Sequence, residues 1–260
     1  MFDKDSGHNC QASITKVAQE AGFYEPEIEV ELNETVEKPA NPVIDKLLRR
    51  EFPTPEGKLS LALYIAVMLK RVPYRRQRAS SLMPQVLDNT VSEIRDWLQT
   101  LIGNAGVDQA LLQERLRQVD EIYEEYQRQP PPQIIKQIRQ PWPTGEMVGL
   151  VEQMTWRILE TSGPHFFMTC DNPAFYFGAY GLKNPEAEVC FPLSTRFALH
   201  CSWQKATADV VFLVASPSFV RETNRRLAST TLRFAFYHEH NEWVNRILTK
   251  ESPYVSRIIW

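Results

Sequence analysis

The first half of the chain is organised by apolar residues that recur every three or four positions, the spacing that places side chains on one face of a helix. The pair Asn41-Pro42 is typical of a helix start, and it precedes a helix predicted over Val43–Glu51. Similar patterns predict three longer helices, over Lys58–Lys70, Ser81–Ile102 and Val107–Gln129. A short helix is also expected over Gln133–Arg139, after a run of prolines.

The second half contains shorter apolar runs that are typical of strands. They predict strands over Trp156–Leu159, Glu188–Leu193, Arg196–Ser202 and Leu232–His238. The run Asp209–Ala215 is continuously apolar after its first residue, which predicts a central strand covered on both faces. Ser216-Pro217 begins a helix expected to end near Ala228, and a last helix is predicted over Glu239–Leu248. The order indicates an α+β fold, with a helix-rich N-terminal and central part and a mostly antiparallel C-terminal sheet.

Composition divides the chain into three parts. Residues 1–40 contain nine Asp or Glu against three Lys, and this acidic segment is expected to be irregular. Within it, Glu25–Glu31 alternates charged and apolar residues, as a short edge strand or a linker would, and Pro26 favours the linker. Residues 41–143 form a helical part and residues 144–260 an α+β part. We expect these two later parts to fold together as one unit.

The overall composition is that of an ordinary globular protein, with 43% hydrophobic and 23% charged residues. A formal net charge of −3 does not indicate any class of partner, whereas a dedicated nucleic-acid-binding protein is usually more basic. The N-terminus has no apolar secretory segment, and the longest apolar stretch, Leu59–Leu69, is about half the length that spans a membrane. We therefore expect a cytoplasmic protein without membrane contact, whose four cysteines are reduced thiols.

Five short features occur in a fixed order along nearly the whole chain. They are Val17–Tyr24 with A-x-E-x-x-F-Y, the helix end Leu69–Pro73, Phe167–Pro173 with T-C-D-N-P, Phe191–Ser194 with P-L-S, and Asn224 before the final strand. In this order they resemble the uncharacterised family called domain of unknown function 4238. Because the function of that family is unknown, the resemblance implies no activity, cofactor or partner.

The chain differs from this family pattern at two places. Family members usually open with a strand that reads roughly H-H-Y-V-P-x-x-Y-L, whereas this chain starts at what resembles the following turn, Asp3–Gly7. If the histidine pair is functional in the family, this chain lacks it or its true start lies upstream. Cys170 also stands where the family usually has serine.

The best candidate site is the T-C-D-N-P segment, because it follows a strand-forming aromatic run and catalytic groups are often carried on loops at strand ends. Asp171 could act as a base or bind a metal, Asn172 could donate to an anion, and Thr169 lies beside them. The alternative is structural, because Asp and Asn before proline form turns by bonding their own backbone. Cys170 would be a nucleophile only beside a histidine, and a buried, inert thiol is more common.

The segment His238-Glu239-His240 raises the question of a metal. Alternate residues on a strand point the same way, so His238 and His240 could share a divalent metal ion with Asp171 or Glu188 as a third ligand. The alternative is that the two histidines are ordinary polar residues at a junction between a strand and a helix. No other cofactor is evident from the sequence.

A basic run over Lys70–Arg78 contains five basic residues in nine, with Tyr74 among them. Arginine beside an aromatic residue suits phosphate contact and base stacking. The candidate residues for binding nucleic acid or phosphate are Arg71, Arg75, Arg76 and, on the late helix, Arg225. The alternative is that the run pairs with acidic residues of the chain itself, in the first forty residues or in the predicted fourth helix.

Two hypotheses about function follow. The first is a binding or interaction protein whose partner is a protein or a nucleic acid, and it is favoured because the chain has no phosphate-binding loop, nucleophile elbow or kinase signature. The second is a hydrolase that acts on nucleic acid or a phosphate ester with a divalent metal. The hydrolase hypothesis predicts that Asp171, His238 and a basic residue share one cleft.

Overall fold

The computed structural model describes residues 1–10, 25–71, 73–104, 106–128, 140–176, 181–239 and 242–249, and it describes the side chains of all these residues except 73–82. The segment Val17–Tyr24, the predicted helix Gln133–Arg139 and His240 lie outside the described residues. The chain forms two compact units. One consists of Met1–Tyr74 with Pro141–Trp260, and the other of Arg75–Gln140.

The first unit contains an almost continuous helical segment in three pieces, α2 (Pro26–Leu32), a π-helical stretch (Asn33–Glu37) and α3 (Lys38–Leu48). The interpretation of Glu25–Glu31 as a linker is therefore wrong. Pro26 occupies the first turn, where a helix needs no N–H, and Glu27 and Glu29 interact favourably with the positive end of the helix dipole. The alternation of charged and apolar residues gave no sign of this helix start.

The same buried helical face continues from α2 into α3. Leu32, Val36 and Ala40 follow one another at a spacing of four residues, and all three are buried. The helix start predicted at Pro42 is too late, because α3 begins at Lys38 and contains Pro42 in its interior. Burial of this face outweighs the one hydrogen bond that Pro42 cannot make.

Two more helices lie against the sheet of this unit, α4 (Pro55–Arg71) and α8 (Gly145–Gln153). Helix α4 is buried along much of its length, through side chains such as Leu61, Ile65 and Leu69, as its apolar composition predicts. In the described part of the chain, no helix combines the length and the apolar character needed to cross a membrane.

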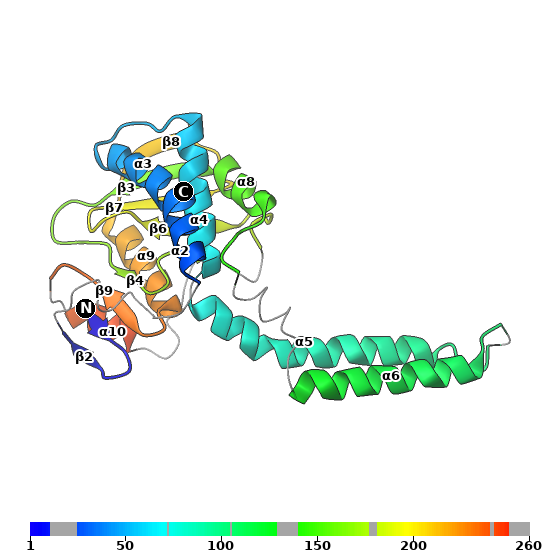
Figure 1. The fold of residues 1–260 in the computed structure, drawn as a ribbon. Coiled ribbons are helices and arrows are strands. Elements are labelled where there is room, and N and C mark those ends of the chain that lie inside the picture. Colours follow the sequence, from blue (N-terminus) through cyan, green and yellow to red (C-terminus); the bar gives the residue numbers. More distant parts are fainter. Residues whose placement is uncertain are drawn as a thin grey trace. The chain divides into compact units, whose positions relative to one another are not determined.

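A five-stranded sheet forms the centre of the first unit (Figure 1). Its strands are β3 (Thr155–Glu160), β5 (Phe175–Tyr176), β6 (Glu188–Pro192), β7 (Phe197–Ser202) and β8 (Val210–Val214), in the spatial order β5-β6-β7-β3-β8. All neighbours are antiparallel except β3 and β8, which are parallel. The fold is α+β, as the sequence predicts, and the strands form two sheets.

The two faces of this sheet differ in chemistry because successive strand residues point to opposite sides. On one face, Trp156, Val189 and Leu199 join the apolar cluster formed with α3, α4 and α8. The other face carries polar side chains from the same strands and is covered by α9 (Pro217–Thr230). Ser216 caps α9 by accepting a hydrogen bond from the Phe219 N–H at 3.2 Å.

The prediction of a central strand over Asp209–Ala215 is wrong. Strand β8 pairs only with β3 among the described strands and forms an edge of the sheet. Val210 and Phe212 pack against the apolar cluster, whereas Leu213 is partly exposed and Val214 is 76% exposed. A continuous apolar run therefore identified a strand here, but not its place in the sheet.

A second, smaller sheet contains strands from both ends of the chain. Its order is β2 (His8–Asn9), β1 (Phe2–Asp3), β9 (Phe234–Phe236) and β4 (Thr169–Cys170), all antiparallel. The turn expected over Asp3–Gly7 joins β1 to β2, and Gly7 has a φ of +69°, which suits glycine. Helix α10 (Glu242–Leu248) packs its buried Val244 and Leu248 into the same apolar cluster as Phe2.

The second unit is a helical hairpin of α5 (Pro73–Gln99) and α6 (Gln109–Arg128). Helix α6 matches the prediction closely, but α5 begins at Pro73 rather than at Ser81. Pro73 fits the first position of a helix for the same reason as Pro26, and Pro84 is accommodated in the interior of α5. The polar stretch before Ser81 hid the first turns of this helix from the hydrophobic pattern.

Candidate functional site

Asp171 binds backbone groups of the neighbouring strand. Its carboxylate accepts hydrogen bonds from the N–H groups of Leu232, Arg233 and Phe234, at 3.0, 2.6 and 3.0 Å. The Asp171 N–H in turn donates to the Phe234 carbonyl at 2.9 Å. The carboxylate therefore fastens the segment that enters β9 to the end of β4. The bonded backbone belongs to a segment sixty residues away in the sequence, rather than to the turn of Asp171 itself.

The thiol of the neighbouring Cys170 is also engaged inside the protein. The buried thiol of Cys170 donates to the Asn172 carbonyl at 3.0 Å and lies 3.7 Å from the Leu227 carbonyl. Burial raises the pKa of Cys170 to about 12, so the thiol is protonated at neutral pH and is a poor nucleophile. Asn172 is buried, and Thr169 pairs with β9.

Asp171 and His238 have different partners. Among the described residues, the Asp171 carboxylate makes no hydrogen bond or ion pair with a histidine. The His238 ring instead packs edge-on against Phe166, with ring centroids 4.6 Å apart, and its Nε2 lies 3.7 Å from Glu239. Within the same described part of the chain, no three His, Cys, Asp or Glu side chains lie close enough together to hold a metal ion.

The basic residue Arg71 is paired with the acidic N-terminal segment. Its guanidinium lies 3.4 Å from Glu29 on α2 and 3.1 Å from Glu37 on the π-helical stretch. The preceding residue, Lys70, donates from Nζ to the Trp142 carbonyl at 2.5 Å. The end of α4 is therefore tied to two other parts of the first unit by its own basic side chains.

The other candidate arginines lie on two helices. Arg225 is about half exposed on α9, and its Nη1 is 3.6 Å from Glu222 on the same helix. The backbones of Arg75 and Arg76 belong to α5, and their side chains lie outside the description. The structure thus gives side-chain partners for Arg71 and Arg225, and both partners are acidic residues of the chain.

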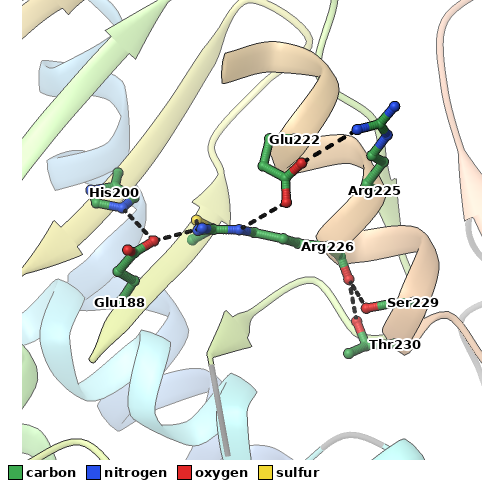
Figure 2. A network of polar contacts seen from close by, with 8 residues as sticks. Glu188, His200, Glu222, Arg225, Arg226, Ser229 and Thr230 are labelled. Atoms are coloured by element: carbon green, nitrogen blue, oxygen red, sulfur yellow. Dashed lines mark hydrogen bonds and ion pairs between the residues drawn. The ribbon is translucent and has the colours of Figure 1, made fainter. Parts of the chain in front are cut away.

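A buried polar network, which the sequence did not reveal, lies between α9 and the sheet (Figure 2). Arg226 of α9 donates from Nη2 to Glu188 at 2.6 Å and from Nη1 to the Cys190 sulfur at 3.0 Å. His200 Nε2 lies 3.3 Å from the same oxygen of Glu188. Glu222, one turn before Arg226, lies 3.9 Å from Arg226 Nε and so extends the network to the edge of the helix.

Strand register brings the polar side chains of the sheet together. Cys190 on β6 is opposite His200 on β7, and His200 is opposite Arg157 on β3. Arg157 is buried beside them, where it donates to the Ser202 hydroxyl at 2.8 Å and to the Gln204 carbonyl at 2.7 Å. Polar residues from three adjacent strands thus form the face of the sheet on which α9 lies.

Electrostatics favour an ionised Glu188 and a neutral His200. Burial pushes the pKa of Glu188 up, but the His200 hydrogen bond and the Arg226 charge outweigh burial, so the pKa lies below its usual value. Burial lowers the pKa of His200, and the neighbouring Glu188 carboxylate only partly opposes that shift. Glu188 and His200 are each at most 1% exposed, so this network joins α9 to the sheet rather than facing solvent.

The seam between α5 and α6 has one polar flank. Val91 and Leu98 of α5 and Leu112 of α6 are buried in the seam. On one side of it, Arg95 forms an ion pair with Asp120 at 2.6 Å. On the same side, the Tyr123 hydroxyl donates to Asp88 at 2.5 Å, and these pairings show that the helices run antiparallel.

The other flank of the seam is apolar. Trp97 and Leu111 stand one residue before Leu98 and Leu112 of the seam, so each is rotated by about 100° in the same sense around its helix. Ile122 lies eleven residues after Leu111, about three turns, and so is on nearly the same side of α6. Because the helices are antiparallel, rotation in the same sense brings these side chains to the same side of the hairpin. We call the exposed large side chains on this side the apolar face, and they are Val86, Ile94, Trp97, Leu111 and Ile122.

The comparison with known families decides the relationship of the chain. The family model described as "Protein of unknown function (DUF4238)" matches residues 1–241. The chain belongs to this family. No curated protein and no solved structure matches it. The resemblance drawn from the spaced motifs is therefore confirmed, and membership of DUF4238 brings no known function with it.

Several residues that carry the DUF4238 resemblance bind backbone groups. Asn224 of α9 accepts from the Met168 N–H at 3.0 Å and donates to the Phe166 carbonyl at 2.8 Å. Ser194 accepts from two backbone N–H groups of the turn that leads into β7. Together with Asp171, these DUF4238 motif positions hold the irregular segments of the first unit in place.

The buried network left a signal in the sequence that the motif search missed. Glu188 and Cys190 alternate with apolar residues in one strand, and His200 and Ser202 do so in the next. A helix with Glu222 and Arg226 four residues apart was available to cover them. Polar residues at alternate positions of strands that are otherwise apolar predict a buried polar layer, and pairing register then decides which of them meet.

Proposed function

We propose that this DUF4238 protein works by binding another protein, and that the apolar face of its helical hairpin is the binding surface. The observation that carries the proposal is the exposure of Trp97, which is 61% exposed, and of Val86, also 61% exposed. Six of the eleven large hydrophobic side chains exposed in the described part of the chain lie on this hairpin, so the exposure is concentrated there. Concentrated apolar surface of this kind is typical of protein-binding sites, and tryptophan is a frequent hot spot.

The polar candidate residues support the same choice. Asp171 and Asn224 are bonded to backbone groups, and Glu188 is bonded to Arg226 and His200 in the interior. Groups engaged in this way stabilise the fold, and their donor and acceptor atoms are less available to act on a substrate. The exposed apolar side chains have no such structural role, and binding a partner would bury them.

The proposal places this binding in the cytoplasm. All four cysteines are free thiols, with Cys10 exposed and Cys170, Cys190 and Cys201 buried. Free thiols, including an exposed one, are typical of proteins in a reducing compartment.

The test is affinity capture from the native cytoplasm with three forms of the full chain. They are the unaltered protein, Trp97→Asp on the apolar face, and Asn89→Asp, which is exposed on α5 and lies two residues from Val91, nearly opposite the seam. Each variant introduces one carboxylate, so the two differ in position and in the loss of the indole. A captured protein is identified by mass spectrometry and the complex is then rebuilt from purified components.

The proposal expects one identified protein to bind the unaltered chain and Asn89→Asp, and to be lost with Trp97→Asp. Circular dichroism checks that both variants keep their helical content. If the rebuilt complex tolerates Trp97→Asp, the apolar face is not the binding surface and the proposal is wrong.

A further inference from the structure

We infer that the partner element is a basic amphipathic helix that lies along the apolar face of the hairpin. This inference rests on the proposed function and names the chemistry of the partner. It draws on the shape of the apolar face and on the charges beside it.

The shape of the apolar face suits a helix. Two antiparallel helices with exposed side chains on the same side present a shallow groove between them, and a third helix fills such a groove in a bundle. Val86 and Trp97 mark the ends of the face on α5, eleven positions apart, which corresponds to about 16 Å of helix. A partner helix of roughly three turns therefore matches the face along its length.

The part of the hairpin that carries the apolar face is acidic. Over residues 83–128 the chain has nine Asp or Glu and four Arg, a net charge of −5, whereas Arg75, Arg76 and Arg78 at the start of α5 bring the charge of the whole hairpin, residues 73–128, to −2. Arg95, Arg117 and Arg128 form ion pairs with acidic residues within the hairpin, and Arg115 donates to Gln118. The four arginines of residues 83–128 are thus engaged within the hairpin, and the excess carboxylates of this stretch remain for a partner.

Two acidic residues stand beside the apolar face, one on each helix. Glu93 lies one turn before Trp97 on α5, and Glu125 lies one turn after Ile122 on α6, so each shares a side of its helix with an exposed apolar residue. Among the described residues, neither carboxylate has an ion-pair partner. A helix with an apolar stripe bordered by Lys or Arg would place cations next to both.

A second copy of this chain fits the same surface poorly. Two apolar faces pressed together would bring Glu93 and Glu125 of one copy close to the same carboxylates of the other, and like charges at an interface disfavour the complex. Charge complementarity therefore selects a basic partner over self-association.

The test uses two synthetic helical peptides as probes, with fluorescence anisotropy as the readout. One peptide repeats LKKLLKL twice, and the other has Glu in place of every Lys. The full chain is titrated in its unaltered form and as Trp97→Asp, Ile122→Asp, Glu93→Lys and two controls. The controls are Ser92→Asp and Asp96→Lys, both exposed positions of α5. Ser92 lies one residue after Val91 and Asp96 one residue after Arg95, so both are rotated away from the apolar face, toward the polar flank.

The inference expects the lysine peptide to bind more tightly than the glutamate peptide. Trp97→Asp and Ile122→Asp should each weaken that binding about tenfold or more, since central apolar anchors dominate interfaces. Glu93→Lys should weaken it roughly threefold to tenfold, and each control less than about twofold.

Other results distinguish a failure of the inference from a failure of the proposed function. If the glutamate peptide binds equally well and Trp97→Asp abolishes its binding, the apolar face still binds a helix but the inference of a basic partner is wrong. If neither peptide binds, the inference is also wrong, and the capture experiment still decides the proposed function. Concentration-dependent dimers in sedimentation velocity that Trp97→Asp abolishes would show that a second copy occupies the face and would likewise overturn the inference.

Discussion

At the scale of single residues, the structure is held by side chains that bond to distant backbone. Asn224 is the clearest case, because its amide donates to one backbone group and accepts from another two residues away. Only a side chain with both a donor and an acceptor can make this pair of bonds. Asp171 uses two acceptor oxygens in a comparable way, on three N–H groups in a row.

The first prediction concerns Asn224→Asp. The carboxylate keeps the bond to the Met168 N–H but turns an acceptor toward the Phe166 carbonyl in a buried position. We expect the free energy of unfolding to fall by about 3 kcal/mol, the cost of a buried unsatisfied and repelled group. Urea denaturation measures the change, with the exposed Asn89→Asp as a control that should stay within about 0.5 kcal/mol. Equal stability of both variants would contradict the role of Asn224.

The second prediction concerns pH and the buried network. The folded-state pKa of His200 lies below its usual value, so on acidification the unfolded chain binds a proton at this residue before the folded protein does. Stability is therefore complete above about pH 6.5 and is lost as the pH falls toward the folded-state pKa. Glu188, whose pKa is also lowered, adds a second loss at lower pH, below its usual value of 4.5.

The measurement is the free energy of unfolding from urea denaturation at several pH values between 7 and 5. His200→Phe should flatten this profile, whatever its effect on stability at pH 7, because the titrating group is gone. A profile of unchanged slope in His200→Phe would mean that other groups cause the acid sensitivity.

At the scale of elements, sequence periodicity predicted most helices and strands but not where each one pairs or packs. Strands β3, β6 and β7 were expected close to their observed bounds, because short apolar runs between turns have few alternatives. Helix α2 was missed because its buried residue, Leu32, follows the alternating segment Glu25–Glu31. Strand β8 was placed wrongly because an apolar run does not show whether a strand pairs on one edge or on both. Strand β1 consists of only two residues, too few for any periodic signal.

The contacts of the T-C-D-N-P residues could not be predicted from the sequence, for a similar reason. The T-C-D-N-P motif pointed to residues with specific bonds, but the partners of those bonds lie about sixty residues away and could not be read from the motif. For the apolar face, the sequence predicted only that each of the two helices carries a stripe of apolar residues. Which residues enter the seam and which stay exposed follows only from how α5 and α6 pair.

The third prediction tests the assignment of β8 as an edge strand. Val214 on β8 is 76% exposed, whereas Val189 on β6 is fully buried. Val214→Lys should change the free energy of unfolding by less than about 0.5 kcal/mol, since exposed positions tolerate substitution. Val189→Lys should cost about 4 kcal/mol or more because it buries a charge without a partner. Urea denaturation compares the two, and a large loss in Val214→Lys would mean that β8 is covered.

At the scale of the whole molecule, the two units differ in how they bury apolar surface. The buried clusters of the described chain, which contain the sheets and the helices around them, include no residue between 75 and 140. The first unit therefore has a core of its own. The chain leaves this unit near Lys70 and returns near Trp142, and a hydrogen bond between these two residues shows that the exit and the return are close together.

The fourth prediction follows from that arrangement. A chain in which residues 75–140 are replaced by a flexible linker of about eight Gly and Ser residues should still fold, because such a linker spans about 15 Å. We expect cooperative urea unfolding and a smaller helical signal in circular dichroism. A shortened chain that shows no cooperative transition would mean that the first unit needs the hairpin to fold.

The central claim of this account is that the protein binds its partner through the apolar face of the hairpin and not through the T-C-D-N-P segment. Hydrogen exchange of the full chain, with and without the lysine peptide, tests the claim most directly because it reports on every described element at once. The account predicts slower exchange within residues 83–128 and unchanged exchange within residues 166–176. Protection of residues 166–176 with none in the hairpin would contradict it.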